Sequence, residues 1–263
     1  MKLIVQSDDF GMTKAVSLGC IEAIKNGIVR NTGMFTNMPD IDECFELIKP
    51  YLEQIALGID LNITTGTSVL SHEFIPSLTK ENGDYYTSKE NRAMDNEENH
   101  FDHLKECRDQ VYAEFKAQIE KYIEIVGHKP DYIHNHAYWT PTIEEVTLSL
   151  AKEYGVLSTM RMHSIEEVKE SSMGWYVYGD AQKQLQSTPL EYITNDTDCL
   201  LDSEYGYIVS HCGYVDIRLF ELSSFNTCRV NDLAAMINSK MKQWIKNNHI
   251  ELITFKDLPE EWI

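Results

Sequence analysis

Short apolar runs alternate with amphipathic stretches along the first part of the chain. The run at residues 3–5 predicts a strand, and residues 15–26 place apolar side chains at helical intervals. A strand over 31–37 and a helix that Asp40 caps come next, followed by residues 55–62, whose near-continuous apolar content suits a strand covered on both faces. This alternation of strands and helices predicts a parallel sheet or barrel.

The rest of the chain continues the alternation with interruptions. Residues 64–100 lack a periodic pattern, and we interpret them as a long excursion over the barrel mouth within one domain spanning 1–263. A substrate-covering role and a solvated insertion both stay open for it. Residues 164–204 give no clear pattern. Further helices are predicted over 103–126, 142–154 and 229–247, and further strands over 130–139, 157–162, 205–214 and 250–254.

The composition is that of a globular protein with a strongly acidic balance. The 263 residues include 23 basic and 42 acidic side chains, for a net charge of −19. This charge argues against nucleic acid and anionic membrane surfaces as partners, and it suits a neutral or cationic small substrate or a recruited divalent cation. No apolar run approaches the ~20 residues of a membrane span, and no signal-peptide pattern precedes the first strand, so we expect a cytoplasmic protein.

Six scattered cysteines form no Cys-x-x-Cys pair. Free thiols, several of them buried, are expected, and a zinc–thiolate site is not. Cys212 differs from the others because it follows His211 near a strand end. A nucleophilic role is one interpretation of it, although no activating dyad is evident.

Two adjacent carboxylates, Asp8 and Asp9, stand where the first strand ends and a helix is about to begin. Catalytic and binding groups gather at the carboxyl ends of parallel strands, and a buried carboxylate is costly without a partner. If the strand continued through them, the two side chains would point in roughly opposite directions, one toward a metal and one toward a proton. The alternative is that one of them only caps the helix.

Histidines mark the ends of two later strands. His134 and His136 lie two residues apart on one strand face, which is common metal-ligand geometry, and Asp60 ends the third strand. A hydrogen-bonded pair of core histidines is the alternative. His211 ends the strand at 205–214 and is well placed for acid–base work.

Other polar and aromatic side chains are ambiguous. Arg161, at the end of the strand predicted over 157–162, could hold a base carboxylate or a substrate oxygen, or form a structural ion pair. Asn62 adds a polar group beyond Asp60. The aromatic segment 173–178 could stack on a sugar or simply pack.

Four stretches together resemble the YdjC-like carbohydrate deacetylases, which are relatives of the NodB-type polysaccharide deacetylases. They are residues 5–11, with the sequence Asp-Asp-Phe-Gly, and residues 27–39, 57–64 and 210–214. The resemblance implies an irregular (β/α) barrel with about seven parallel strands. It also implies removal of an N-acetyl group from an amino sugar or short chito-oligosaccharide with a divalent metal.

Carried over by position, the resemblance makes Asp8 the general base, His211 the general acid, and Asp9 and His136 metal ligands. Arg161 matches an arginine that follows a later strand of the family. Two positions depart from the family: Asp60 stands where it has a ligand histidine, and His134 where it has an aspartate. We expect metal binding to survive with Asp9, Asp60 and His136 as ligands. His134, Arg161 and Asn62 would then lie around the metal or the substrate.

Mg²⁺ is the expected ion, with Zn²⁺ or Mn²⁺ as alternatives, because carboxylates favour harder ions. Two other functions stay open: a sugar-binding barrel that has lost the reaction, and a metal-dependent hydrolase of another small substrate. A phosphoester substrate fits poorly with the scarcity of basic side chains near the motifs. The expected partners are a small-molecule or oligosaccharide substrate and, in a homodimer, a second copy of the chain.

Overall fold

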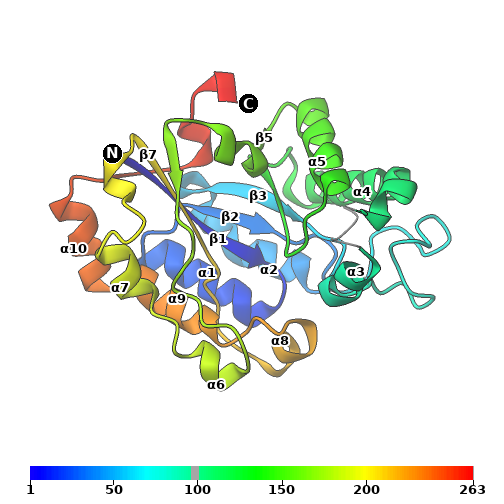
Figure 1. Ribbon diagram of the computed structural model, residues 1–263, viewed down its shortest axis with the longest axis horizontal. Coiled ribbons are helices and arrows are strands. Elements are labelled where there is room, and N and C mark those ends of the chain that lie inside the picture. The colour runs from blue at the N-terminus through cyan, green and yellow to red at the C-terminus, as the bar shows by residue number, and fades with distance from the viewer. Residues whose placement is uncertain (96–100, 263) are drawn as a thin grey trace.

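A computed structural model describes residues 1–95 and 101–262, which form a curled parallel sheet flanked by helices (Figure 1). The strand order is β5-β4-β3-β2-β1-β7-β6, with β8 beside the first residues of β1, and every strand pairing is parallel. The strands are β1 Lys2–Phe10, β2 Asn31–Met34, β3 Ala56–Leu61, β4 Tyr132–Asn135, β5 Leu157–Ser158, β6 Val168–Glu170, β7 Tyr205–Ser210 and β8 Glu251–Ile253.

Figure 1 shows α1, α2 and α9 along one side of the sheet, with α4 and α5 beside β3 and β4. In the described part of the chain, none of the helices combines the length and apolarity that a bilayer crossing requires. The helices are α1 Lys14–Asn26, α2 Ile41–Ile48, α3 Ser88–Met94, α4 Arg108–Val126, α5 Pro141–Tyr154, α6 Ala181–Gln184, α7 Pro189–Thr194, α8 Ile217–Leu222, α9 Cys228–Ile237 and α10 Ser239–Asn247.

The predicted α/β architecture with parallel strands is confirmed, in the form of an incompletely closed barrel. The sheet ends at β5 on one edge and at β6 on the other, and within the described residues these two edges do not pair. The wall between them is therefore built by loops and short helical turns, and the interior of the curled sheet is accessible from that side.

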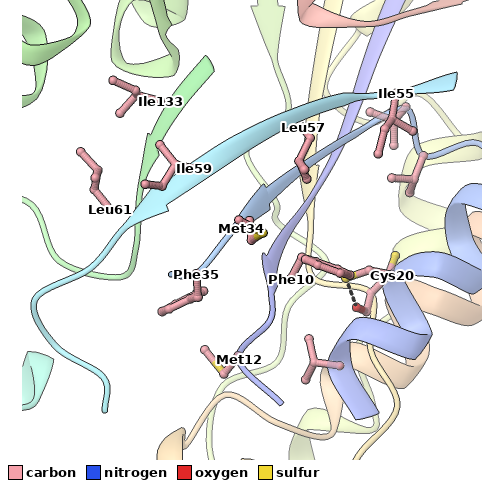
Figure 2. Packing of buried hydrophobic residues seen from close by; sticks show 14 of the residues in the cluster. Phe10, Met12, Cys20, Met34, Phe35, Ile55, Leu57, Ile59, Leu61 and Ile133 are labelled. Carbon is pink, nitrogen blue, oxygen red and sulfur yellow. Dashed lines mark hydrogen bonds between the residues drawn. The ribbon is translucent and has the colours of Figure 1, made fainter. Parts of the chain in front are cut away.

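Two apolar clusters lie on the two faces of the sheet. Leu3 and Val5 of β1 belong to the outer cluster, which packs against the helices, whereas Ile4 belongs to the inner one. Since side chains alternate along a strand, the inner series of β1 continues from Ile4 to Asp8. Figure 2 shows part of the outer cluster, including Leu57, Ile59 and Leu61 of β3, Phe10 of β1 and Cys20 of α1.

Several predicted elements differ from the structure in their bounds, among them the following three. The helix predicted over 229–247 is two helices, because Asn238 takes an extended conformation and its side chain accepts from the Lys240 backbone N–H at 2.8 Å. The strand predicted over 157–162 stops at Ser158, whose side chain caps a 3-10 turn over Thr159–Ser164. The strand predicted over 31–37 ends at Met34.

The excursion after β3 is folded onto α4. Glu114 of α4 is fully buried and accepts backbone N–H groups from Val69 at 2.9 Å and Leu70 at 3.0 Å. The excursion also contains α3, a helix that the sequence pattern did not indicate, with a complete Thr87–Glu90 capping box. The part of the excursion at residues 96–100 lies outside the described residues. The described part is therefore held by buried hydrogen bonds, which a freely solvated insertion would lack.

Candidate active site

The end of β1 is bent where the two aspartates occur. Asp9 has a left-handed backbone conformation with φ of 71°, and the pairing of β1 with β2 shifts register between Ser7 and Phe10. Strict alternation would send the two carboxylates to opposite faces. Instead Asp8 contacts His134, in β4, and Asp9 contacts His136, which follows that strand. A non-glycine residue in this conformation costs free energy, and such strain is often found at functional sites.

Asp9 is 1% exposed and has a side-chain partner on each carboxylate oxygen. Its Oδ2 accepts from Nη2 of Arg229 at 2.6 Å, and its Oδ1 lies 2.8 Å from Nδ1 of His136. Burial alone would raise the pKa of Asp9, but His136 and Arg229 outweigh it and hold this pKa well below its usual value. The side chain is therefore a carboxylate at neutral pH.

Asp9 and His136 have the arrangement of a ligand pair. Asp9 Oδ1 and His136 Nδ1 lie 2.8 Å apart, so the two side chains converge on one point. His136 is oriented from its other side, where Nε2 lies 3.2 Å from the Thr65 hydroxyl and its backbone N–H donates to Leu61 O. A carboxylate oxygen and an imidazole nitrogen that converge on one point are donors that suit a divalent cation.

Asp60 lies next to this pair but does not complete a three-residue ligand set in this structure. Its Oδ2 accepts from the Asp9 backbone N–H at 2.7 Å, and its buried Oδ1 has no partner in the part of the chain that is described. That oxygen lies against Gly33, where a Cβ atom would be 1.7 Å from it. Burial first, and then the charge of Asp8, raise the pKa of Asp60 well above its usual value.

Within the described residues, three potential ligand atoms lie within 4.8 Å of one another only in the group Asp95, Asp102 and His103. The carboxylates of that group already have partners. Asp102 accepts from the backbone N–H groups of Leu104 and Thr142, and Asp95 accepts from His103 and the Tyr138 hydroxyl. These bonds fix the end of the excursion against the start of α5, which is a structural role.

Buried Asp8 and partly buried His134 form a pair on the inner face. His134 Nε2 lies 3.1 Å from Asp8 Oδ2, and its Nδ1 lies 2.6 Å from the Thr159 hydroxyl. Gln6 donates to the other oxygen of Asp8 and accepts from the Tyr207 hydroxyl. Burial opposes both charges, but each charge favours the other: the pKa of Asp8 is lowered, and that of His134 is raised to about 9. Asp8 is therefore ionised at neutral pH.

His211 follows β7 and is held through its Nδ1 side. Its Nδ1 lies 2.9 Å from the Tyr176 hydroxyl, and its backbone N–H donates to Asp232 Oδ2 at 2.7 Å. The Tyr176 hydroxyl also donates to that Asp232 oxygen. Burial lowers the pKa of His211 to about 4, so the ring is uncharged at neutral pH in the resting protein.

Within the described residues, two other predicted site residues, Asn62 and Arg161, form no hydrogen bonds with the aspartates and histidines above. Asn62 is buried, and its amide bonds to Asn37 and to backbone atoms of Thr64 and Thr65, so it shapes the loop after β3. Arg161 is exposed in the 3-10 turn after β5. The arginine that contacts Asp9 is Arg229, not Arg161.

A cavity of about 970 Å³ opens beside His134 on the side where the barrel is not closed. Its walls come from the end of β4, from β6 and β7, from α3 and α5, and from the segments after β4 and β5. The residues that line it include His134, Trp139, Arg161, His163, Glu170 and Tyr207. It is wide enough for a ligand larger than one acetyl group.

The sequence pattern did not reveal Arg229 and Asp232 as site residues. They lie three apart on α9, so they share one helix face, and each is at most 1% exposed. Arg229 reaches Asp9 and Asp232 reaches His211. The sequence did contain one sign of their role: two opposite charges stand beside the apolar residues of a helix. Charges buried at such a position need partners.

Cys212 is fully buried between β7 and α1. Burial raises the pKa of its thiol well above the ordinary value, which leaves the thiol protonated at neutral pH. A protonated thiol is a weak nucleophile. The carboxylates and imidazoles described above are therefore the better candidates for chemistry at this site.

Residues 2–247 match the family of YdjC-like proteins. A relative from Listeria innocua serovar 6a, named carbohydrate deacetylase 2, is 29% identical, covering 99% of this chain and 100% of its own. A carbohydrate deacetylase from Clostridium beijerinckii is 30% identical, covering 98% and 100%. The crystal structure of a protein from Enterococcus faecalis V583, described as a candidate cellobiose-phosphate cleavage protein, superposes with a TM-score of 0.79 at 24% identity. The match covers 97% of each chain. The last likeness shows the shared fold.

Proposed function

Since the chain belongs to the YdjC-like protein family, we propose that it is a hydrolase that removes an N-acetyl group from an amino sugar or a short chito-oligosaccharide with a divalent metal ion. Two relatives that match over nearly the whole chain bear the name carbohydrate deacetylase. Net hydrolysis adds one water across the amide C–N bond and yields acetate and a free amine.

The observation that carries the proposal is the convergence of Asp9 Oδ1 and His136 Nδ1, an oxygen and a nitrogen donor 2.8 Å apart. These two side chains would hold the ion, and Asp60 would join them if its side chain rotated away from Gly33. When bound, a divalent ion polarises an acetamide carbonyl and acidifies water. Mg²⁺ suits two carboxylates and one imidazole, with Zn²⁺ and Mn²⁺ as alternatives.

Asp8 and His211 would handle the protons. Asp8 is ionised, and each of its oxygens keeps a second lone-pair direction beside the bonds to Gln6 and His134, so it can accept a proton from the attacking water. His211 would deliver a proton to the amide nitrogen as the C–N bond breaks. Because its ring is uncharged at rest, it must gain that proton within the catalytic cycle.

The cavity beside His134 would receive the sugar. Trp139 is 59% exposed at its wall, and the indole N–H is fixed by Glu144 at 3.0 Å. An exposed indole held in one orientation is a suitable face for a sugar ring. Arg161 lines the same cavity and would bond to sugar hydroxyls.

The test is release of acetate from a panel of N-acetylated sugars, with the protein treated with chelator and then supplied with Mg²⁺, Zn²⁺ or Mn²⁺ in turn. We expect release that chelator abolishes and one of the ions restores. Asp109→Asn is a matched surface control for changes at Asp8, since the Asp109 side chain is fully exposed. Sugar binding without acetate release under any of these ions would refute the hydrolase and support the non-catalytic barrel.

A further inference from the structure

Tyr176, in the aromatic segment before α6, has no role in the reaction proposed above. Tyr176 is 8% exposed, and its hydroxyl lies between the imidazole of His211 and the carboxylate of Asp232. Its neighbour Tyr178 is 73% exposed. The two tyrosines therefore differ: the first is buried in a polar network at the site, and the second faces solvent.

Asp232 can only accept hydrogen bonds when it is ionised, and all its close contacts are donors. The Trp175 indole N–H donates to Oδ1 at 3.1 Å, and the His211 backbone N–H donates to Oδ2 at 2.7 Å. The Tyr176 O–H also donates to Oδ2. Asp232 is fully buried, so these three donors take the place of water around the carboxylate.

The direction of the Tyr176 bond decides the protonation of the imidazole. A hydroxyl has one proton, and here it points to Asp232, so the oxygen can offer only a lone pair to His211 Nδ1 at 2.9 Å. Nδ1 must then carry a hydrogen. In the uncharged ring the other nitrogen, Nε2, has the free lone pair, and no hydrogen bond occupies it within the described residues.

From this chain of contacts we propose that Tyr176, oriented by Asp232, is a positioning residue that fixes His211 in the Nδ1–H tautomer and presents Nε2 to the substrate. The tautomer of His211 follows from the contacts alone, and only its effect on catalysis rests on the proposed function. Once protonated, Nε2 gives its proton to the leaving amine, and the ring returns to the tautomer that Tyr176 already accepts. No rearrangement of the network is required in either direction.

Packing around the ring supports the same role. Phe225 meets the His211 ring edge-on with centroids 4.9 Å apart, and Tyr176 does so at 5.8 Å. The Phe225 carbonyl in turn accepts from Arg229 Nε at 3.0 Å. These contacts hinder a flip of the imidazole that would exchange its two nitrogens.

The experiment compares Tyr176→Phe with Tyr178→Phe as a matched control that removes a hydroxyl outside the network. Long-range ¹H–¹⁵N NMR spectra of the metal-free protein report the His211 tautomer, with the signals assigned by their loss in His211→Gln. We expect the Nδ1–H form in the wild type and in Tyr178→Phe, and a mixture or the Nε2–H form in Tyr176→Phe. The Nε2–H form in the wild type, or an unchanged tautomer in Tyr176→Phe, would overturn the proposal.

Kinetics provide the second measurement. Tyr176→Phe should lower kcat for acetate release by at least about 10-fold with little change in KM, because the acid–base step and not sugar binding is affected. Tyr178→Phe should leave kcat within about twofold, as expected for a group outside the acid–base step. If the wild-type protein releases no acetate, the proposed function fails, while the tautomer spectra still decide the role of Tyr176.

Discussion

Arg229→Gln removes the guanidinium from a carboxylate that has almost no access to water. Arg229 and Asp9 are each 1% exposed, and the bond between them is 2.6 Å long. Glutamine keeps part of the side-chain volume and a donor amide but carries no charge. The Asp9 carboxylate would then keep His136 as its one close side-chain partner among the described residues.

The magnitude follows from the separation of the charges and their burial. Two unit charges about 4 Å apart interact by about 4 kcal/mol at an effective dielectric constant of about 20. Removing one partner of a buried pair costs about 3–5 kcal/mol in measured cases. Because His136 still lies 2.8 Å from the other oxygen of Asp9, we expect the lower end of this range, a loss of about 3 kcal/mol in the free energy of unfolding.

Urea unfolding at pH 7, followed by tryptophan fluorescence and extrapolated linearly to water, measures this loss. Arg218→Gln is the matched control. Its ion pair with Asp40 is 3.3 Å long and the two side chains are 40% and 46% exposed, so less than about 1 kcal/mol is expected. Adding Asp9→Asn to Arg229→Gln should recover part of the loss. Equal losses in the two arginine variants would refute the reasoning.

Three further predictions concern the site. Asp8→Asn should reduce acetate release by at least about 100-fold while metal affinity by calorimetry is retained; unchanged turnover would remove Asp8 as the base. Gly33→Ala should lower the free energy of unfolding by about 1–3 kcal/mol or more. Its added Cβ would lie 1.7 Å from Asp60 Oδ1, whereas the nearest atoms to a Cβ at Gly213 are 3.4 Å away. Gly213→Ala is therefore the control, and an equal loss of unfolding free energy in that variant would contradict the prediction. The ring of His211, whose pKa burial lowers to about 4, should not titrate by NMR between pH 5 and 8. Since the unfolded chain takes up this proton at about pH 6.5, the contribution of His211 to stability should be complete above that pH and decline toward pH 4. A His211 titration midpoint near about 6.5 in the folded protein would contradict this prediction.

The order of elements could be predicted because it depends on short-range patterns. The strand at the start of the chain, the helix over Lys14–Asn26 and the strand that precedes His211 were all expected from apolar spacing. The errors occur where a single side chain overrides the pattern. Asn238 splits one predicted helix, and the Ser158 cap ends one predicted strand, although the apolar residues continue on both sides.

The candidate residues were partly visible for the same reason. Asp8, Asp9 and His134 lie near the ends of their strands and His136 directly follows one, and parallel strands bring their carboxyl ends to one edge of the sheet. Their pairing required the structure. The left-handed turn at Asp9 places both carboxylates toward the histidines, which alternation along a straight strand would not do.

The sequence by itself determined most of the strands, though not β6, together with their apolar faces and the polar groups near their ends, because these properties depend on residues a few positions apart. Only the tertiary structure decided which charges are neutralised and which ring nitrogen is free. Arg229 meets Asp9 across 220 positions, and Tyr176 meets His211 across 35. Such contacts depend on where whole helices and loops pack, and burial then sets the electrostatic strength of each contact, so no local pattern encodes them.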